Sequence, residues 1–338
     1  MANDSHLFRE RATLEELGGE LSGARFLLPD GKEYWPLYEA KMVHFYNSRF
    51  ADYADLPEGS KSTQLPRVSV EKLKDPAFST MPRYWVAKEE VLRKVPGDFK
   101  FLIGFRGISN STNERTFITA PIPLTAVSGK FPVVYIMNTH CKPWGLCGDL
   151  PSFVHDYVVR KKISGTDASI FIVQQIATLP PSVYDEACPF DATKSVGEFV
   201  KPRVLELTYT SWDMKGFAES LGYEGAPFAW NEERRFRLRC ELDALYFALY
   251  LGRDEWRRAT VAEERPEDFA ALTRYFPTPL DALDYIMGTF PIVKRKEEED
   301  AALRGYARRL LASIGAPEDE ERYPSFAAIR ALFLRGIR

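Results

Sequence analysis

The spacing of apolar residues changes once along the chain, near Pro202, and this change constrains the fold more than any other feature. Before it, short runs rich in Val, Ile, Phe and Tyr alternate with a period of two, as in RTFITAPIPL and FPVVYIM. After it, apolar residues recur every three or four positions, which indicates helices. The sequence therefore predicts an α+β protein with a β-rich domain followed by a mainly α-helical domain.

Three segments follow from this pattern. Leucines at helical spacing and the pair Gly18-Gly19 predict a short helix and connector over residues 1–25. We expect a β-rich domain over residues 26–185 and a helical domain over residues 186–338. The stretch DEACPFDATKSVGEFVKP, residues 185–202, has the composition of a linker between them.

The clearest helix is predicted within NEERRFRLRCELDALYFALYLG. Asn231 is a favourable N-cap, Glu232 and Glu233 lie in the first turn where the helix dipole favours acids, and Gly252 ends the segment. We expect the later helices to pack with this one as a bundle that braces the β-rich domain. They lie within TPLDALDYIMGTF, EEEDAALRGYARRLLASIG and YPSFAAIRALFLRGI.

The overall composition is that of an ordinary soluble protein. The 338 residues carry a formal net charge of −3, so any contact with nucleic acid must come from a local basic patch. No run of about 18 apolar residues is present, and the charged N-terminus lacks a signal-peptide core. Four scattered cysteines do not form a disulfide framework. We therefore expect a cytoplasmic protein without a membrane span.

One short pattern has the shape of a nuclease signature. Asp30 follows a proline, and Glu39 and Lys41 come later in the order of a PD-(D/E)xK motif, in which two carboxylates hold Mg²⁺ and the lysine polarises water. Glu39 and Lys41 would face the same way on a strand. Such patterns arise often by chance in a chain with 28% charged residues. A stand-alone Mg²⁺-dependent nuclease is therefore kept as the alternative function.

Other catalytic signatures are absent from the sequence. It has no nucleophile elbow and no glycine-rich nucleotide loop. His140, Cys141, Cys147 and His155 are possible zinc ligands, but free cysteines are more commonly small buried hydrophobic residues. We predict no catalytic residue and no metal site in this chain.

A polar and basic constellation lies in the β-rich part. The segment between Arg83 and Arg115 is locally cationic, and NSTNERTFITAPIP, residues 110–123, indicates a polar turn that leads into a strand. The triplet Arg160-Lys161-Lys162 precedes Gly165-Thr166, whose amides and hydroxyl suit a phosphate. The alternative is a solvated surface on which Glu114 pairs with Arg115.

Five stretches in the same order together resemble one family, and a sixth stretch lies within the extent of the same likeness. They are PLYEAKMVHFYNSRFADY, RYWVAKEEV, FLIGFRGISNSTNERTFITAPIP, FVHDYVVRKKISGTDASIFIVQQIATLPP, RVLELTYTSWDMKGFAESLGYEGAPFAWNEERRFRLRCELDALYFALY and LDYIMGTFPIVKRKEEE. The chain thus resembles, from about residue 30 to 300, the C-terminal region of type IIG-like restriction-modification enzymes and adenine-specific DNA methyltransferases. In that family this region holds the target recognition domain.

The resemblance implies sequence-specific recognition of double-stranded DNA without catalysis by this chain alone. The nuclease and methyltransferase domains precede these stretches in the family, so S-adenosylmethionine and Mg²⁺ are expected only in missing or partner domains. The chain would then be a detached recognition part, whose partners are DNA and possibly a methyltransferase or nuclease chain. It also argues against the nuclease motif, which falls at the entry to the recognition domain.

The expected DNA-binding residues come from two loops. They are Arg106, Asn110, Asn113, Arg115, Thr116, Arg160, Lys161, Lys162, Gly165 and Thr166. Base-reading side chains are also expected within residues 60–73 or 130–148. We expect Arg115→Ala to weaken duplex binding while leaving the fold intact.

Overall fold

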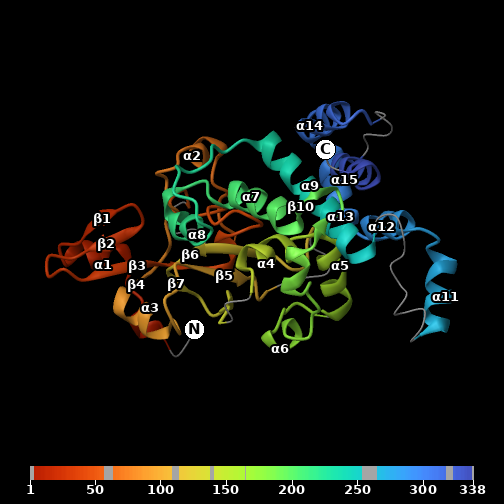
Figure 1. Ribbon diagram of the computed structural model, residues 1–338. Helices are drawn as coiled ribbons and strands as arrows, with labels where there is room; N and C mark the ends of the chain where they lie inside the picture. The colour runs from red at the N-terminus through yellow and green to blue at the C-terminus, as the bar shows by residue number, and fades with distance from the viewer. Residues whose placement is uncertain are drawn as a thin grey trace.

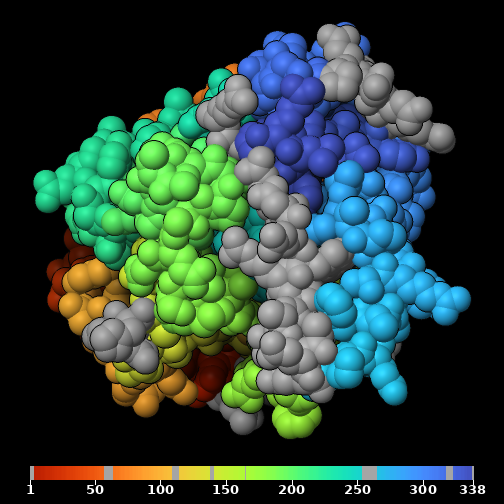
Figure 2. Space-filling model, turned by 45° about the vertical axis from the view of Figure 1, so that its right-hand side comes forward, coloured from red at the N-terminus to blue at the C-terminus, as the bar shows by residue number. Residues whose placement is uncertain are grey.

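Helix α9, Glu232–Leu251, lies in the middle of the protein, between a β-rich side and a group of C-terminal helices (Figure 1). The structure is a computed structural model that describes residues 4–56, 64–108, 114–137, 141–163, 165–252, 265–316 and 323–336. Figure 2 shows residues of the N-terminal part, in red and orange, at the left and lower left, the C-terminal residues, in blue, on the right, and green residues between them. The observed elements confirm the predicted α+β class.

The strands form three small sheets. The first is antiparallel in the order β1-β2-β3-β4, and β7 pairs with β3 in parallel. The second has the order β6-β5-β8, and the third is the pair β9-β10. Their bounds are β1 Glu20–Ser22, β2 Arg25–Leu27, β3 Glu33–Tyr38, β4 Trp85–Ala87, β5 Phe101–Phe105, β6 Thr119–Pro123, β7 Ala126–Val127, β8 Val133–Val134, β9 Ala187–Cys188 and β10 Asp191–Ser195.

The second sheet explains an apolar run in the sequence. Strand β5 is buried at every position, which accounts for the continuous apolar run FLIGF. Its neighbour β6 contains Pro121 and Pro123, which are tolerated because β6 is an edge strand of this sheet. At Gly104 a Cβ atom would lie 2.2 Å from the Phe131 ring, so this close approach requires glycine.

Helices surround these sheets. In the N-terminal half they are α1 Arg11–Glu16, α2 Val70–Lys74, α3 Lys88–Lys94, α4 Pro143–Asp149, α5 Phe153–Lys162 and α6 Ile170–Val173. In the C-terminal half they are α7 Val196–Thr208, α8 Lys215–Ser220, α9, α11 Pro266–Tyr275, α12 Pro279–Gly288, α13 Pro291–Glu299, α14 Ala301–Ser313 and α15 Pro324–Arg335. The residues predicted as a linker, 185–202, instead form β9, β10 and the first half of α7.

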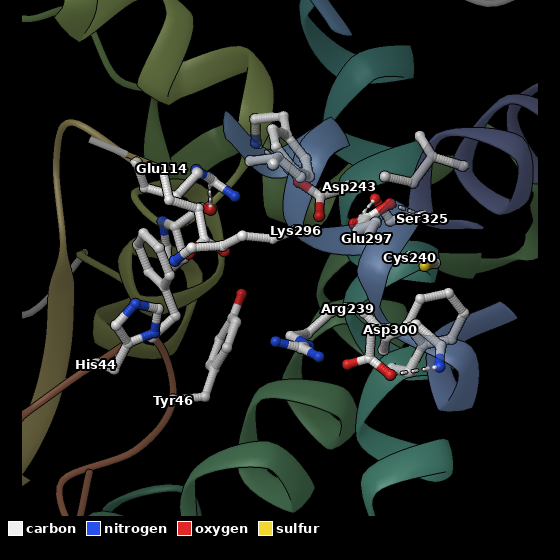
Figure 3. Close-up of a pocket in the computed structure, with 18 of the residues that line it drawn as sticks. His44, Tyr46, Glu114, Arg239, Cys240, Asp243, Lys296, Glu297, Asp300 and Ser325 are labelled. Atoms are coloured by element: carbon white, nitrogen blue, oxygen red, sulfur yellow. Dashed lines mark hydrogen bonds and ion pairs between the residues drawn. The ribbon is translucent and has the colours of Figure 1, made fainter. Parts of the chain in front are cut away.

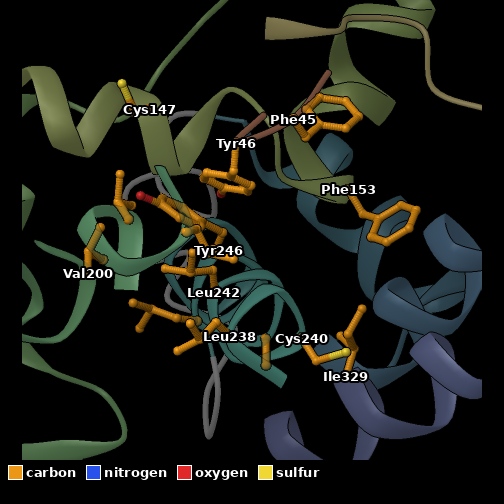
Figure 4. Close-up of a cluster of buried hydrophobic side chains, with 14 of the residues drawn as sticks. Phe45, Tyr46, Cys147, Phe153, Val200, Leu238, Cys240, Leu242, Tyr246 and Ile329 are labelled. Carbon is orange, nitrogen blue, oxygen red and sulfur yellow. The ribbon is translucent and has the colours of Figure 1, made fainter. Parts of the chain in front are cut away.

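Helix α9 begins and ends where the sequence predicts. The Asn231 side chain accepts a hydrogen bond of 2.9 Å from the Arg234 amide, and Gly252 follows the last turn with a φ of 82°. Its buried residues extend beyond one stripe, because α5, α7, α14 and α15 pack around it. The shared core also contains Phe45 and Phe153, so it joins both sides of the protein (Figure 4).

Two buried arginines tie distant segments together. Arg49 is 1% exposed, and its guanidinium group donates to four backbone carbonyls, those of Leu73, Asp75, Phe78 and Thr210. Arg235 in α9 donates to the carbonyls of Leu207 and Tyr46 and lies 3.7 Å from the centre of the Trp230 ring. The planar fork of arginine suits such multiple bonds.

Candidate functional site

A cleft of about 370 Å³ lies between the β-rich side and the C-terminal helices (Figure 3). Its walls come from the turn after η2 (Ala40–Met42), from the loop before β6, and from α9, α13, α14 and α15. We call it the arginine cleft, because Arg67, Arg115 and Arg239 line it and Arg106 lies beside it. These segments are far apart in the sequence, so only the fold brings their charges together.

A tight turn shapes one wall of the cleft. His44 and Asn47 exchange two backbone hydrogen bonds of 2.9 Å, which closes a turn over Phe45 and Tyr46. Tyr46 has a φ of 53°, the left-handed region, at a cost of about 1–2 kcal/mol. The turn buries Phe45 and Tyr46 in the core and leaves His44 on the cleft, with its ring stacked on Phe50 at 4.7 Å.

Four arginines surround His44. Burial lowers the pKa of His44 well below its usual value, and the charges of Arg106, Arg239, Arg115 and Arg67 lower it further. The imidazole ring is therefore neutral near pH 7 and adds no charge of its own. The repulsion that keeps it neutral also marks this end of the cleft as a place that favours an anion.

Arg67 and Arg106 form the outer part of this group. Their guanidinium carbons lie 5.1 Å and 5.6 Å from the centre of the Phe50 ring. Arg106 donates from Nε to the Val43 carbonyl at 3.1 Å. Burial and the charge of Arg67 lower the pKa of Arg106 to about 10, so it stays protonated at neutral pH. Among the described residues, neither arginine has a carboxylate within ion-pair distance.

The helical wall carries acids that already accept hydrogen bonds from other protein groups. Glu297 accepts hydrogen bonds from the amide and hydroxyl of Ser325, and burial raises its pKa to about 7. Asp243 accepts from the Phe153 amide at 2.8 Å, and burial raises its pKa to about 6. Asp300 caps α14. The neighbouring Glu114 forms an ion pair with Lys296.

Arg239 lies near these acids but forms no ion pair with any of them. Within the part of the chain that the structure describes, no carboxylate lies within 4.0 Å of its guanidinium group. Figure 3 shows Arg239 and Tyr46 reaching into the same space of the cleft. Arg67, Arg106 and Arg239 therefore form a cationic surface around His44 that a bound anion can neutralise.

The predicted residues Arg115, Thr116 and Arg160 belong to an internal network. Arg115 is 8% exposed, donates to the Pro151 carbonyl and lies 4.0 Å from the centre of the Phe153 ring. Arg160 donates to Thr116 Oγ1 at 3.0 Å and to the Thr289 carbonyl at 2.8 Å. Their guanidinium groups hold the β-rich side against α12 and face protein groups.

Asp156 is the centre of that network. Its fully buried carboxylate accepts from the amides of Thr116 and Phe117 at 2.9 Å and 2.7 Å. Arg115 lies 3.8 Å and Arg160 3.5 Å from its Oδ2 atom. A buried carboxylate with two amides and two arginines is well compensated. Sequence analysis did not include Asp156, which pairs with residues about 40 positions earlier.

The second predicted loop lies beside the first. Lys161 and Lys162 end α5 and are exposed, and the Lys161 ammonium lies 4.8 Å from the centre of the Tyr157 ring. Gly165 and Thr166 are exposed too, and the chain then pairs Asp167 with Ile108 across an antiparallel bridge. None of these four residues lines the arginine cleft. Asn110 and Asn113 lie outside the described residues.

Three of the seven cations between Arg83 and Arg115 form ion pairs near the surface. Lys88 pairs with Glu33 at 2.8 Å, and Lys100 pairs with Asp98 at 3.1 Å. Arg93 pairs with Glu90 one helical turn away. The solvated-surface alternative describes these three pairs, but its pairing of Glu114 with Arg115 is wrong, because Glu114 pairs with Lys296 and Arg115 lies beside Asp156. Arg115 lines the arginine cleft, and Arg106 lies next to it.

The residues of the nuclease motif do not share a strand. Strand β3 ends at Tyr38, and Glu39 caps the 3-10 helix η2 that follows. Lys41 lies 3.5 Å from Glu39, whose other oxygen accepts from Tyr53. Asp30 pairs with Lys32 in the turn between β2 and β3. The expectation that Glu39 and Lys41 lie together on a strand is wrong, because the chain turns after Tyr38.

Sequence analysis missed three features of the cleft, namely His44, Arg67 and Arg239. Arg67 falls within residues 60–73, which were expected to hold base-reading side chains. Arg239 ends the run RRFRLR of α9, a signal that points to a basic face without showing which member lacks a partner. Within the described residues, no cluster of His, Cys, Asp or Glu is arranged to hold a metal ion.

Comparisons with known proteins give no further assignment. None of the protein-family models, curated proteins or solved structures matches this chain. Among the described residues, no helix combines the length and the apolar character that a bilayer span requires. The function is therefore argued from the cleft and from the resemblance carried by the sequence.

Proposed function

We propose that this chain binds double-stranded DNA at the arginine cleft and acts as the specificity part of a restriction-modification or DNA adenine methyltransferase system. The observation that carries the proposal is the group of Arg67, Arg106 and Arg239 around His44, in which no described carboxylate forms an ion pair with an arginine. Catalysis, with S-adenosylmethionine and any Mg²⁺, would belong to domains outside this chain.

The charge arrangement supports a phosphate ligand. Arginines present planar donors that match phosphate oxygens, and grouped arginines keep their charge even when partly buried. When these arginines neutralise DNA phosphates, counterions leave the duplex, and this release favours binding at low salt. A protein with a net charge of −3 then binds DNA through one local surface instead of its whole exterior.

The resemblance supports the same surface. Four of the first five similar stretches, and the sixth, contribute residues to the walls of the cleft. Examples are His44 from the first, Arg115 from the third, Arg239 from the fifth and Lys296 from the sixth. If these stretches serve DNA recognition in the family, their meeting at one cleft is the arrangement that such a role requires.

Within this proposal the predicted residues divide into two groups. Arg106 contacts phosphate, and Lys161, Lys162, Gly165 and Thr166 form a second phosphate contact on the neighbouring loop. Arg115, Thr116 and Arg160 act indirectly, because they hold the wall in place. Contacts to base edges, which give specificity, are assigned to side chains at the rim of the cleft.

The first test measures the salt dependence of duplex binding. We would titrate a fluorescein-labelled duplex of random sequence with the protein and follow anisotropy over a series of salt concentrations. Arg67→Gln and Arg239→Gln should each weaken binding and reduce the slope of log K against log salt by about one. Arg330→Gln is the matched control, because this exposed arginine pairs with Asp284 on α12.

The second test addresses specificity. Repeated selection from a pool of random duplexes should enrich one sequence, and the enriched duplex should compete better than single-stranded DNA of the same sequence. If Arg67→Gln, Arg239→Gln and Arg330→Gln all gave the same slope of log K against log salt, the arginine cleft would not be part of the DNA interface. Binding without any enriched sequence would reject the recognition role while leaving DNA binding in place.

A further inference from the structure

A second cavity lies on the other side of α5, between that helix and the β6-β5-β8 sheet. It has a volume of about 370 Å³ and shares no lining residue with the arginine cleft. Its walls are mostly apolar and include Phe105, Phe117, Val134, Leu150, Val173 and Ile176. Helix α6, which closes one side, has four residues, and its Phe171 side chain is 74% exposed.

His155 is a buried polar side chain in the wall of this mostly apolar cavity, as is Thr119. It lines the wall and is fully inaccessible to solvent. Neither ring nitrogen has a hydrogen-bond partner within 3.5 Å among the described residues. Its backbone amide bonds to Ser152 as part of the cap of α5, so the helix fixes the position of the ring. A buried polar group without a partner is costly, and natural sites of this kind commonly serve a ligand.

The ring is a hydrogen-bond acceptor at neutral pH. Burial and the positive charge of Arg115 lower the pKa of His155 to about 4, against a smaller opposing effect of the Leu150 backbone. A neutral imidazole carries one N–H group and one free lone pair. With the N–H facing the Leu150 side, the lone pair is available to a donor that enters the cavity.

We propose that this cavity binds a small flat aromatic molecule with a single N–H or O–H group, which donates a hydrogen bond to His155. The apolar walls supply most of the affinity, because they remove the rings from water. The histidine supplies selectivity, because a ligand without a donor leaves the lone pair unsatisfied. This inference is independent of the DNA-binding proposal.

The test uses two probes of the same shape, indole and benzofuran, which differ by an N–H group against an oxygen. Calorimetric titration of the full chain should show that indole binds about tenfold more tightly than benzofuran. In His155→Phe that preference should disappear, and the melting temperature should rise because an unpartnered polar group has been removed. Equal binding of the two probes to the native chain would overturn the role of His155.

A second variant tests the location. Val173→Phe places a larger side chain in the cavity and should abolish indole binding. Phe171→Trp, on the same short helix but outside the cavity, should leave it unchanged. If Val173→Phe binds indole as the native chain does, the ligand lies elsewhere and the proposal fails, even where His155→Phe does not fold.

Discussion

Arg115 and Asp156 lie 3.8 Å apart, Nε to Oδ2, in the interior of the protein, where Asp156 has no exposed surface. Arg160 approaches the same oxygen, and two backbone amides complete the set of donors. The pair joins the loop before β6 to helix α5. Arg115, which the sequence predicts to bind DNA, thus stabilises the fold instead.

Asp156→Ala should destabilise the protein by about 3–5 kcal/mol, since it leaves a buried and a partly buried arginine without their shared carboxylate. Denaturation by urea, followed by circular dichroism, measures this change. Asp167→Ala is the control, because Asp167 is exposed and its pairing with Lys130 is worth at most about 1 kcal/mol. For the same reason we now expect Arg115→Ala to lower stability. A native-like unfolding curve for Asp156→Ala would contradict the buried network.

Arg49→Lys should cost at least about 3 kcal/mol although the charge is kept. A lysine ammonium cannot reach the four carbonyls that the guanidinium group serves, and each buried carbonyl without a donor costs about 1–3 kcal/mol. Arg330→Lys, at an exposed pair, should change stability by no more than about 0.5 kcal/mol. Equal unfolding midpoints for the two variants would refute the tethering role of Arg49.

Glu297 and Asp149 should each lower the stability of the protein as the pH rises from about 5 to 7. Burial raises the pKa of Glu297 and of Asp149 to about 7, whereas in the unfolded chain both carboxyl groups ionise near pH 4. The folded state therefore holds protons that the unfolded state has released, and stability falls by up to about 1.4 kcal/mol per pH unit for each group.

Glu297→Gln isolates one of these two contributions. The amide can hold Ser325 as the protonated acid does, without a proton to lose. Between pH 5 and 7, the decrease of unfolding free energy with pH should then be smaller by up to about 1.4 kcal/mol per pH unit, which corresponds to one proton. Glu298→Gln, at the next position in the chain, serves as the comparison. An unchanged slope in Glu297→Gln would assign the pH dependence to other groups.

His44→Glu should weaken duplex binding about tenfold at low salt. The new carboxylate would stand among four arginines and occupy them as an internal anion. His44→Gln keeps a neutral side chain at the same place and should bind DNA as the native chain does. Equal affinities of the two variants would show that the arginine cleft is not where DNA binds.

The features that sequence analysis predicts well are local ones. The start and end of α9 depend on Asn231, the two glutamates after it and Gly252, all within the helix or next to it. The β-rich to helical order follows from periodicity in the same way. The end of strand β3 at Tyr38 was not predicted, because the sequence does not show whether Glu39 caps a helix or continues a strand.

The site depends on long-range pairing, which spacing does not reveal. Arg115 and Arg239 carry the same charge in the sequence, but Asp156 lies beside only the first. Within the described residues, contacts across 40 or more positions therefore decide which arginine lacks an ion pair. The cleft collects arginines from separate segments, so no contiguous basic motif marks it.

The hydrogen bond from Arg235 to the Tyr46 carbonyl spans 189 positions and has a consequence for synthesis. The turn at Tyr46 leaves the ribosome long before α9 does, so its anchor is missing during much of translation. A gene interrupted ahead of residue 235 would encode the turn with its own backbone hydrogen bonds and the Tyr46–Gly148 contact, but without the Arg235 donor. The full set of donors to this early turn is therefore complete only after the C-terminal half has been made.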